Sequence, residues 1–198
     1  METKNKRRKQ TEALVLGAVL TALVIILQLM GSFIRFGPFA ISLVLIPIVI
    51  GAATCGIKVG AWLGFVFGAV VLLSGDAAAF MAVDVFGTIV TVLLKGTACG
   101  LAAGIVYKVL ENFNRYVAVI AAAIVCPLVN TGVFLLGCVV FFLETVTEWG
   151  LLEGYGGAFS YMFLGLVGGN FLFELGSNII LSPVIVRILS MEKNKSKL

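Results

Sequence analysis

Two ionisable side chains lie deep inside apolar segments of the chain. Lys95 follows Thr-Ile-Val-Thr-Val-Leu-Leu, and Glu174 lies within Gly-Gly-Asn-Phe-Leu-Phe-Glu-Leu-Gly-Ser-Asn. In membrane helices, a rise of about 1.5 Å per residue puts both side chains near the middle of the bilayer. Ionisable groups cost free energy there and by default mark a functional site. Lys95 has the charge to hold an anionic group, and Glu174 can accept hydrogen bonds or balance the charge of Lys95.

Asparagine side chains accompany both charges. Asn130, in the segment Cys-Pro-Leu-Val-Asn-Thr-Gly, is expected at the same depth on another helix. Asn170, Glu174 and Asn178 are spaced by four residues, so they share one helical face. Together with Lys95, these groups predict a polar pocket for a small hydrophilic or amphipathic solute. The alternative is an ion pair between Lys95 and Glu174, with hydrogen-bonded asparagines, that only holds the helices together.

Two further residues are candidate contacts of the solute. Trp62 could supply an aromatic surface to a ring-bearing ligand, or it could face lipid or the protein core. Arg35 could clamp an anionic group at the mouth of the pocket, or it could extend toward the membrane interface without a role in binding.

The sequence points to no metal site, no cofactor and no enzyme. Histidine is absent, and the four cysteines form no Cys-x-x-Cys pair. We interpret Cys55, Cys99, Cys126 and Cys138 as small packing residues. No nucleophile is paired with a base in the sequence pattern, which argues against a membrane enzyme.

The elements that position these residues are membrane helices. Of the 198 residues, 61% are hydrophobic and 12% are charged, which excludes an ordinary cytosolic protein. The apolar runs predict an all-α integral membrane protein with six transmembrane helices: Ala13–Phe33, Phe39–Gly56, Val59–Ser74, Val85–Leu110, Tyr116–Leu143 and Ser160–Leu189. The whole chain, 1–198, is expected as one membrane domain, with a basic cytoplasmic N-terminus (1–12), a six-helix bundle (13–189) and a basic cytoplasmic tail (190–198).

Charge predicts the orientation, because lysine and arginine concentrate on the cytoplasmic side. Both ends of the chain are basic, so both termini are expected inside, which demands an even number of spans. The connections with Lys58, Lys108 and Arg115 then lie inside, and those with acidic residues lie outside. Arg35, on the outer side, is the exception. The outer connections Ser74–Phe86 and Thr145–Phe159 are expected as loops that act as lids or as plain connections.

The first apolar segment carries a small-residue face. Gly17, Ala18 and Ala22 lie in small-xxx-small pairs that let another helix approach closely, within the chain or from a partner. The chain has no Gly-x-x-x-x-Gly-Lys-Ser/Thr phosphate-binding motif, so it has no ATPase motor of its own. Uphill transport would therefore need a partner or an ion gradient.

These features together resemble a known family. The basic start, the small-residue first helix, the Phe-Gly-Pro-Phe-Ala-Ile-Ser-Leu run from residue 36, the Pro-x-x-Asn-Thr-Gly segment and the Gly-Asn-Phe…Glu-Leu stretch are similar to the substrate-binding S component of energy-coupling factor (ECF) transporters. The resemblance is closest to the branch with riboflavin, pantothenate and folate carriers.

The resemblance implies a function and partners. S components capture a micronutrient from outside with helices four to six and the outer loops. They dock through the first helix on a transmembrane coupling subunit that two ATPase subunits drive. On this chain, docking would map to Ala18 and Ala22, with Gly17 beside them, and solute binding to Lys95, Asn130, Asn170 and Glu174.

We therefore expect a multi-pass protein of a bacterial-type plasma membrane that contacts lipid, a vitamin-like solute and the coupling module, and no nucleic acid. One alternative is a stand-alone ion-coupled transporter in which Lys95 and Glu174 form an ion relay. The other alternative is a structural membrane protein that binds no small molecule.

Overall fold

The computed structural model describes residues 2–33, 35–36, 39–40 and 43–195, with side chains for 10–31 and 43–187. Apart from two short strands, the described residues are mainly helical. In order, the elements are α1 (Glu2–Phe33), β1 (Arg35–Phe36), β2 (Phe39–Ala40), α2 (Leu45–Thr54), α3 (Ile57–Ser74), α4 (Ala78–Met81), α5 (Val85–Leu110), α6 (Arg115–Phe141), α7 (Leu143–Leu152), α8 (Ala158–Ser160), the π-helical turn η1 (Tyr161–Val167) and α9 (Gly168–Lys195).

Five helical segments in the described part of the chain are long and apolar enough to cross a membrane: Gln10–Gly31, Ile57–Ser74, Val85–Leu110, Arg115–Phe141 and Ala158–Arg187. The expected second span is shorter than predicted. Phe39 and Ala40 pair with Phe36 and Arg35 in an antiparallel ladder, and α2 begins only at Leu45. A helix of ten residues is about 15 Å long, half the thickness of a bilayer core. Five spans are therefore supported, and a sixth is not confirmed.

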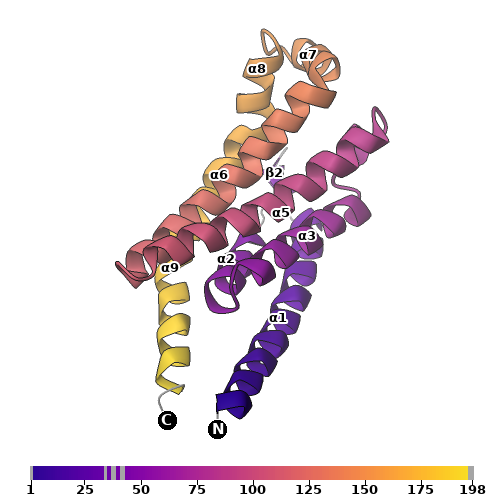
Figure 1. Cartoon of the computed structure of the whole chain (residues 1–198). Helices are drawn as coiled ribbons and strands as arrows, with labels where there is room; N and C mark the ends of the chain where they lie inside the picture. The colour runs from indigo at the N-terminus through magenta and orange to yellow at the C-terminus, as the bar shows by residue number, and fades with distance from the viewer. Residues whose placement is uncertain (1, 34, 37–38, 41–42, 196–198) are drawn as a thin grey trace.

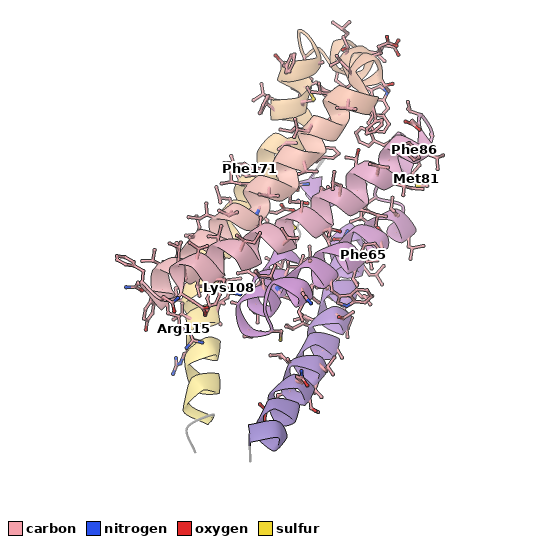
Figure 2. All side chains as sticks on the ribbon, viewed as in Figure 1. Phe65, Met81, Phe86, Lys108, Arg115 and Phe171 are labelled. Atoms are coloured by element: carbon pink, nitrogen blue, oxygen red, sulfur yellow. The ribbon has the colours of Figure 1, made fainter. Side chains whose placement is uncertain are left out.

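The two ends of the described chain lie at the same end of the bundle. Figure 1 shows that α1 begins near the point where α9 ends, with α7 and α8 at the opposite end. Lys108 and Arg115 lie at the end of the α5–α6 hairpin that is nearer to the chain ends, and Phe86 lies at the other (Figure 2). This arrangement fits termini on one side of a membrane. Which side that is remains a prediction.

Helices α3 and α5 pack at backbone contact along two rows of glycines. The α3 row is Gly60, Gly64 and Gly68, and the α5 row includes Gly96 and Gly100, with spacings of four residues. A Cβ atom on Gly60 would lie 2.7 Å from the carbonyl oxygen of Gly100, and one on Gly64 would collide with the carbonyl of Gly96. Small residues at this spacing let membrane helices approach closely. The contact fixes the register of α5 against α3.

The expected outer loops contain helices. The Ser74–Phe86 connection includes α4, and the Thr145–Phe159 connection includes most of α7. The ring of Phe80 on α4 lies edge-on to Phe134 at 5.6 Å, to Phe142 at 5.1 Å and to Trp149 at 5.4 Å between centroids. Such aromatic pairs prefer edge-to-face geometry. The cluster joins α4 to α6 and α7, so this end of the bundle is packed rather than open.

The outer surface of the long helices is apolar. Leu14, Leu94, Leu136 and Ile180 are exposed, one on each of α1, α5, α6 and α9. A water-soluble protein rarely exposes so much apolar surface, whereas lipid covers it without cost. The fold is that of a multi-pass membrane protein.

Candidate substrate-binding site

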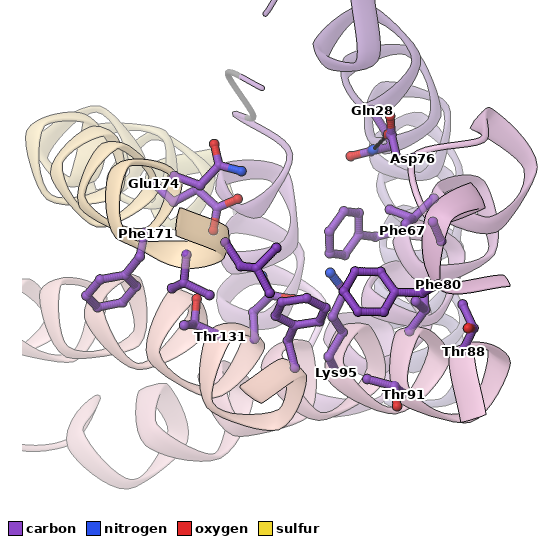
Figure 3. Close-up of a pocket in the computed structure, with 18 of the residues that line it drawn as sticks. Gln28, Phe67, Asp76, Phe80, Thr88, Thr91, Lys95, Thr131, Phe171 and Glu174 are labelled. Atoms are coloured by element: carbon purple, nitrogen blue, oxygen red, sulfur yellow. Dashed lines mark hydrogen bonds between the residues drawn. The ribbon is translucent and has the colours of Figure 1, made fainter. Parts of the chain in front are cut away.

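A cavity of about 260 Å³ lies inside the bundle, with walls from α1, α3, α4, α5, α6, η1 and α9 (Figure 3). Its polar lining residues are Gln28, Asp76, Thr88, Thr91, Lys95, Asn130, Thr131, Asn170 and Glu174. Its aromatic lining residues are Phe67, Phe80, Phe134, Phe142 and Phe171. A cavity with mainly apolar walls and a few convergent polar groups is the usual form of a small-molecule site.

Lys95 enters the cavity from α5, one residue before Gly96 in the close α3–α5 contact. Its ammonium lies 5.0 Å from the ring centroid of Phe134 and 5.8 Å from that of Phe67. Among the residues that the structure describes, the ammonium forms no ion pair. The face of an aromatic ring attracts a cation electrostatically, and the N–H groups of the ammonium stay available for hydrogen bonds to a solute. Lys95 is therefore held in place without its hydrogen-bonding capacity being used.

The carboxylate of Glu174 enters the same cavity from α9, on the opposite wall from Lys95 (Figure 3). Only 8% of Glu174 is exposed. Asn170 lies one turn earlier on α9, and Asn130 approaches the Glu174 carboxylate from α6. The spacing of four residues between Asn170 and Glu174 places both on the face of α9 that lines the cavity.

Three oxygen atoms that line the cavity are buried and have no hydrogen-bond partner among the described residues: Thr91 Oγ1, Asn130 Oδ1 and Asn170 Oδ1. A buried polar atom without a partner costs about 1–3 kcal/mol. Hydrogen-bond donors on a polar solute could satisfy all three atoms.

Sequence reasoning missed several lining residues, among them Gln28 and Asp76 at one end of the cavity. Gln28 of α1 donates a hydrogen bond from Nε2 to Asp76 Oδ2 at 2.8 Å, and Ser74 Oγ donates to the same oxygen at 3.0 Å. Gln28 is a polar residue inside the first apolar segment, which was a usable signal. Thr88 and Thr91 were also detectable, because they precede Lys95 by seven and four residues on one helical face.

Trp62 and Asn178, two further residues predicted to contact the solute, are not among the residues that line this cavity. Trp62 is 53% exposed, and its indole N–H donates to Thr21 Oγ1 at 3.2 Å. Asn178 is buried one turn beyond Glu174 and donates from Nδ2 to the Glu174 carbonyl at 2.8 Å. Spacing shows which residues share a face, but not how far along the helix the cavity extends. The backbone of Arg35 lies in β1, and its side chain falls outside the described residues.

The three candidate docking residues on α1 separate into two faces. Gly17 is buried, and a Cβ atom there would lie 3.6 Å from Val59 of α3, so this position packs inside the chain. Ala18 and Ala22 are exposed on the outer face of α1. An outer small-residue pair remains available to a partner helix, whereas Gly17 supports the α1–α3 contact.

The fold is that of a multi-pass membrane protein with an internal cavity lined by polar and aromatic side chains. Residues 12–189 match the family model for the substrate-specific component of ECF transporters, and the chain belongs to this family. No curated protein and no solved structure matches the chain.

Family membership confirms the resemblance to S components and favours it over the two alternatives. The branch with riboflavin, pantothenate and folate carriers stays a prediction. S components bind small-molecule substrates and work with a transmembrane coupling subunit and ATPases. The family is one of transporter components and not of enzymes.

Proposed function

We propose that the chain captures a vitamin or related small metabolite from outside a bacterial-type cell and holds it in the cavity between α5, α6 and α9. The observation that carries this proposal is the convergence of Lys95, Asn130, Asn170 and Glu174 on one cavity. Three buried oxygen atoms that line the same cavity and have no hydrogen-bond partner among the described residues support it.

Each polar group has a proposed role. Lys95 holds an anionic group of the solute, because its ammonium is positioned by two rings and forms no ion pair within the described residues. Asn130 and Asn170 fix the orientation of the solute through their buried amides. Glu174 accepts hydrogen bonds from the solute or balances Lys95. Arg35 stays a predicted clamp, and we assign no solute contact to Trp62 or Asn178.

The proposed partners are a transmembrane coupling subunit and two ATPase subunits. The exposed pair Ala18 and Ala22 on α1 is the proposed contact with the coupling subunit, because it presents backbone to an approaching helix. ATP hydrolysis by the partners would then drive uptake of the captured solute.

Mass spectrometry of the full chain, purified in mild detergent, tests the proposal. We expect a small molecule to co-purify with the wild-type protein and to be lost from Thr91→Trp, whose indole would occupy the cavity. Leu94→Trp is the matched control, since Leu94 lies on the same helix but is 56% exposed on the outer surface. Equal amounts of the molecule in the wild type and in Thr91→Trp would contradict the proposal.

A transport assay separates this function from ion-coupled transport. Proteoliposomes that contain only this chain should show no accumulation of the co-purified molecule, with or without a proton or sodium gradient. Accumulation that collapses with the gradient would favour the stand-alone transporter instead.

A further inference from the structure

The two walls of the cavity differ in hydrogen-bonding character. The wall made by α9 and α6 presents the Glu174 carboxylate, which accepts hydrogen bonds, and the amides of Asn130 and Asn170, which both accept and donate. The wall made by α5 presents the Lys95 ammonium, a donor of three hydrogen bonds, and the hydroxyl of Thr91, which accepts and donates. Glu174 therefore calls for a donor on the solute, Lys95 calls for an acceptor, and the amides and the hydroxyl can serve either.

The opposite charges on the two walls are not paired with each other. Within the described chain, Lys95 and Glu174 form no ion pair, and the near neighbours of the Lys95 ammonium are the rings of Phe67 and Phe134. Space for the solute thus lies between the charges and not to one side of them.

Charge balance limits which solutes the site can take. In a buried site with a low dielectric constant, a charge without a counter-charge costs several kcal/mol of free energy. A solute with only an anionic group would pair with Lys95 and leave Glu174 without a counter-ion. A solute with only a cationic group would do the reverse. A solute that carries both groups completes both walls and adds no net charge. Asp76, the third charged residue of the lining, already accepts hydrogen bonds from Gln28 and Ser74.

The lining and the volume of the cavity limit the polarity and the size of the solute. Phe67 and Phe134 flank the donor side, and Leu166 and Val167 also line the cavity, so the middle of the solute meets apolar surface. The cavity volume of about 260 Å³ lies near the lower end of the range of roughly 300–1,000 Å³ that is usual for small-molecule sites. This size favours a compact molecule.

We propose that the solute is a compact amphoteric molecule, with an anionic group on Lys95, a protonated amine or equivalent donor group on Glu174, and an apolar or ring-shaped middle. This inference rests on the proposed function, in which the cavity is the solute site.

Two matched sets of probes test the inference on the full chain in lipid nanodiscs. The aromatic set is 4-(aminomethyl)benzoate, 4-methylbenzoate and 4-methylbenzylamine, and the aliphatic set is 6-aminohexanoate, hexanoate and hexylamine. Binding is measured by isothermal titration calorimetry. In at least one set, the amphoteric member should bind at least tenfold more tightly than both singly charged members.

Charge-removing variants assign the two ends. Glu174→Gln should cancel the advantage of the amphoteric probe over the carboxylate probe, and Lys95→Met should cancel its advantage over the amine. Glu148→Gln is the control, because Glu148 is exposed and lies outside the cavity. An advantage that persists in both cavity variants would show that the probe binds elsewhere, and would overturn the inference.

Other outcomes separate this inference from the proposed function. Carboxylate probes that bind as tightly as the amphoteric ones, in a Lys95-dependent way, would overturn the inference and leave the solute site in place. The inference would also be overturned if the wild-type protein bound all six probes no more tightly than the Thr91→Trp variant does. The co-purification experiment would then decide whether the cavity is the solute site.

Discussion

The ammonium of Lys95 lies 5.0 Å from the centroid of the Phe134 ring, which joins α5 to α6 inside the membrane domain. A second ring, that of Phe67 on α3, lies 5.8 Å from the same ammonium. The rings attract the cation through their faces, with about 0.5–2 kcal/mol for each contact. A bilayer-buried lysine is thus positioned by three helices while its N–H groups stay available to a solute.

Replacing Lys95 with alanine should weaken solute binding at least tenfold, or about 1.4 kcal/mol. The reason is that the variant loses the cationic group proposed to hold the anionic end of the solute. Calorimetric titration with the molecule identified by co-purification measures the change. Lys108→Ala is the control, because Lys108 is exposed near the end of α5. Unchanged affinity in Lys95→Ala would remove this residue from the site.

Asn130→Ala should likewise weaken binding at least tenfold, about 1.4 kcal/mol. Asn130 is only 6% exposed, and its Oδ1 has no partner in the described protein, so the solute is its proposed partner. Asn112→Ala gives the comparison, since Asn112 is exposed outside the long helices. The same titration applies, and equal affinities in the two variants would reject the assignment of Asn130.

Long apolar runs predicted most of the helices well, because burial in lipid requires helical backbone throughout a span. The predicted run Val85–Leu110 has the same bounds as α5. The run Phe39–Gly56 was less well predicted, because part of it pairs as a two-residue strand. Apolar composition alone does not show whether the backbone hydrogen bonds of such a segment form within a helix or between paired strands.

Depth and spacing also brought together four of the residues predicted for the site. Lys95, Asn130, Asn170 and Glu174 all line the cavity, although their role in binding remains a prediction. Gln28 was missed although an amide inside a long apolar helix is a usable signal. The placement of Trp62 outside the cavity depends on the rotation of α3, which close packing against α5 determines and single-helix patterns do not show.

Ala18→Trp or Ala22→Trp should abolish uptake by the reconstituted transporter and leave solute binding unchanged. An indole on the outer face of α1 would prevent the close approach of a coupling-subunit helix. Solute binding should not change, because Ala18 and Ala22 are exposed and do not line the cavity. Uptake of the radiolabelled co-purified molecule and calorimetric binding are measured in parallel. Ile180→Trp on α9 is the control, because Ile180 is also exposed, at 75%. If uptake survives both alanine substitutions, the docking surface lies elsewhere.

Gly64→Ala should lower the thermal stability of the purified protein, because its methyl group would collide with the carbonyl of Gly96 on α5. Overpacking of this kind costs about 1–3 kcal/mol. Gly132→Ala on α6 is the matched control, since a Cβ atom there meets nothing within 4 Å, and alanine favours a helix over glycine. Thermal unfolding followed by intrinsic fluorescence should show a lower midpoint for Gly64→Ala and an unchanged or higher one for Gly132→Ala. Since the α3–α5 contact positions Lys95 beside Phe67, Gly64→Ala should also weaken solute binding. Equal midpoints in the two variants would show that the glycine rows do not hold these helices together.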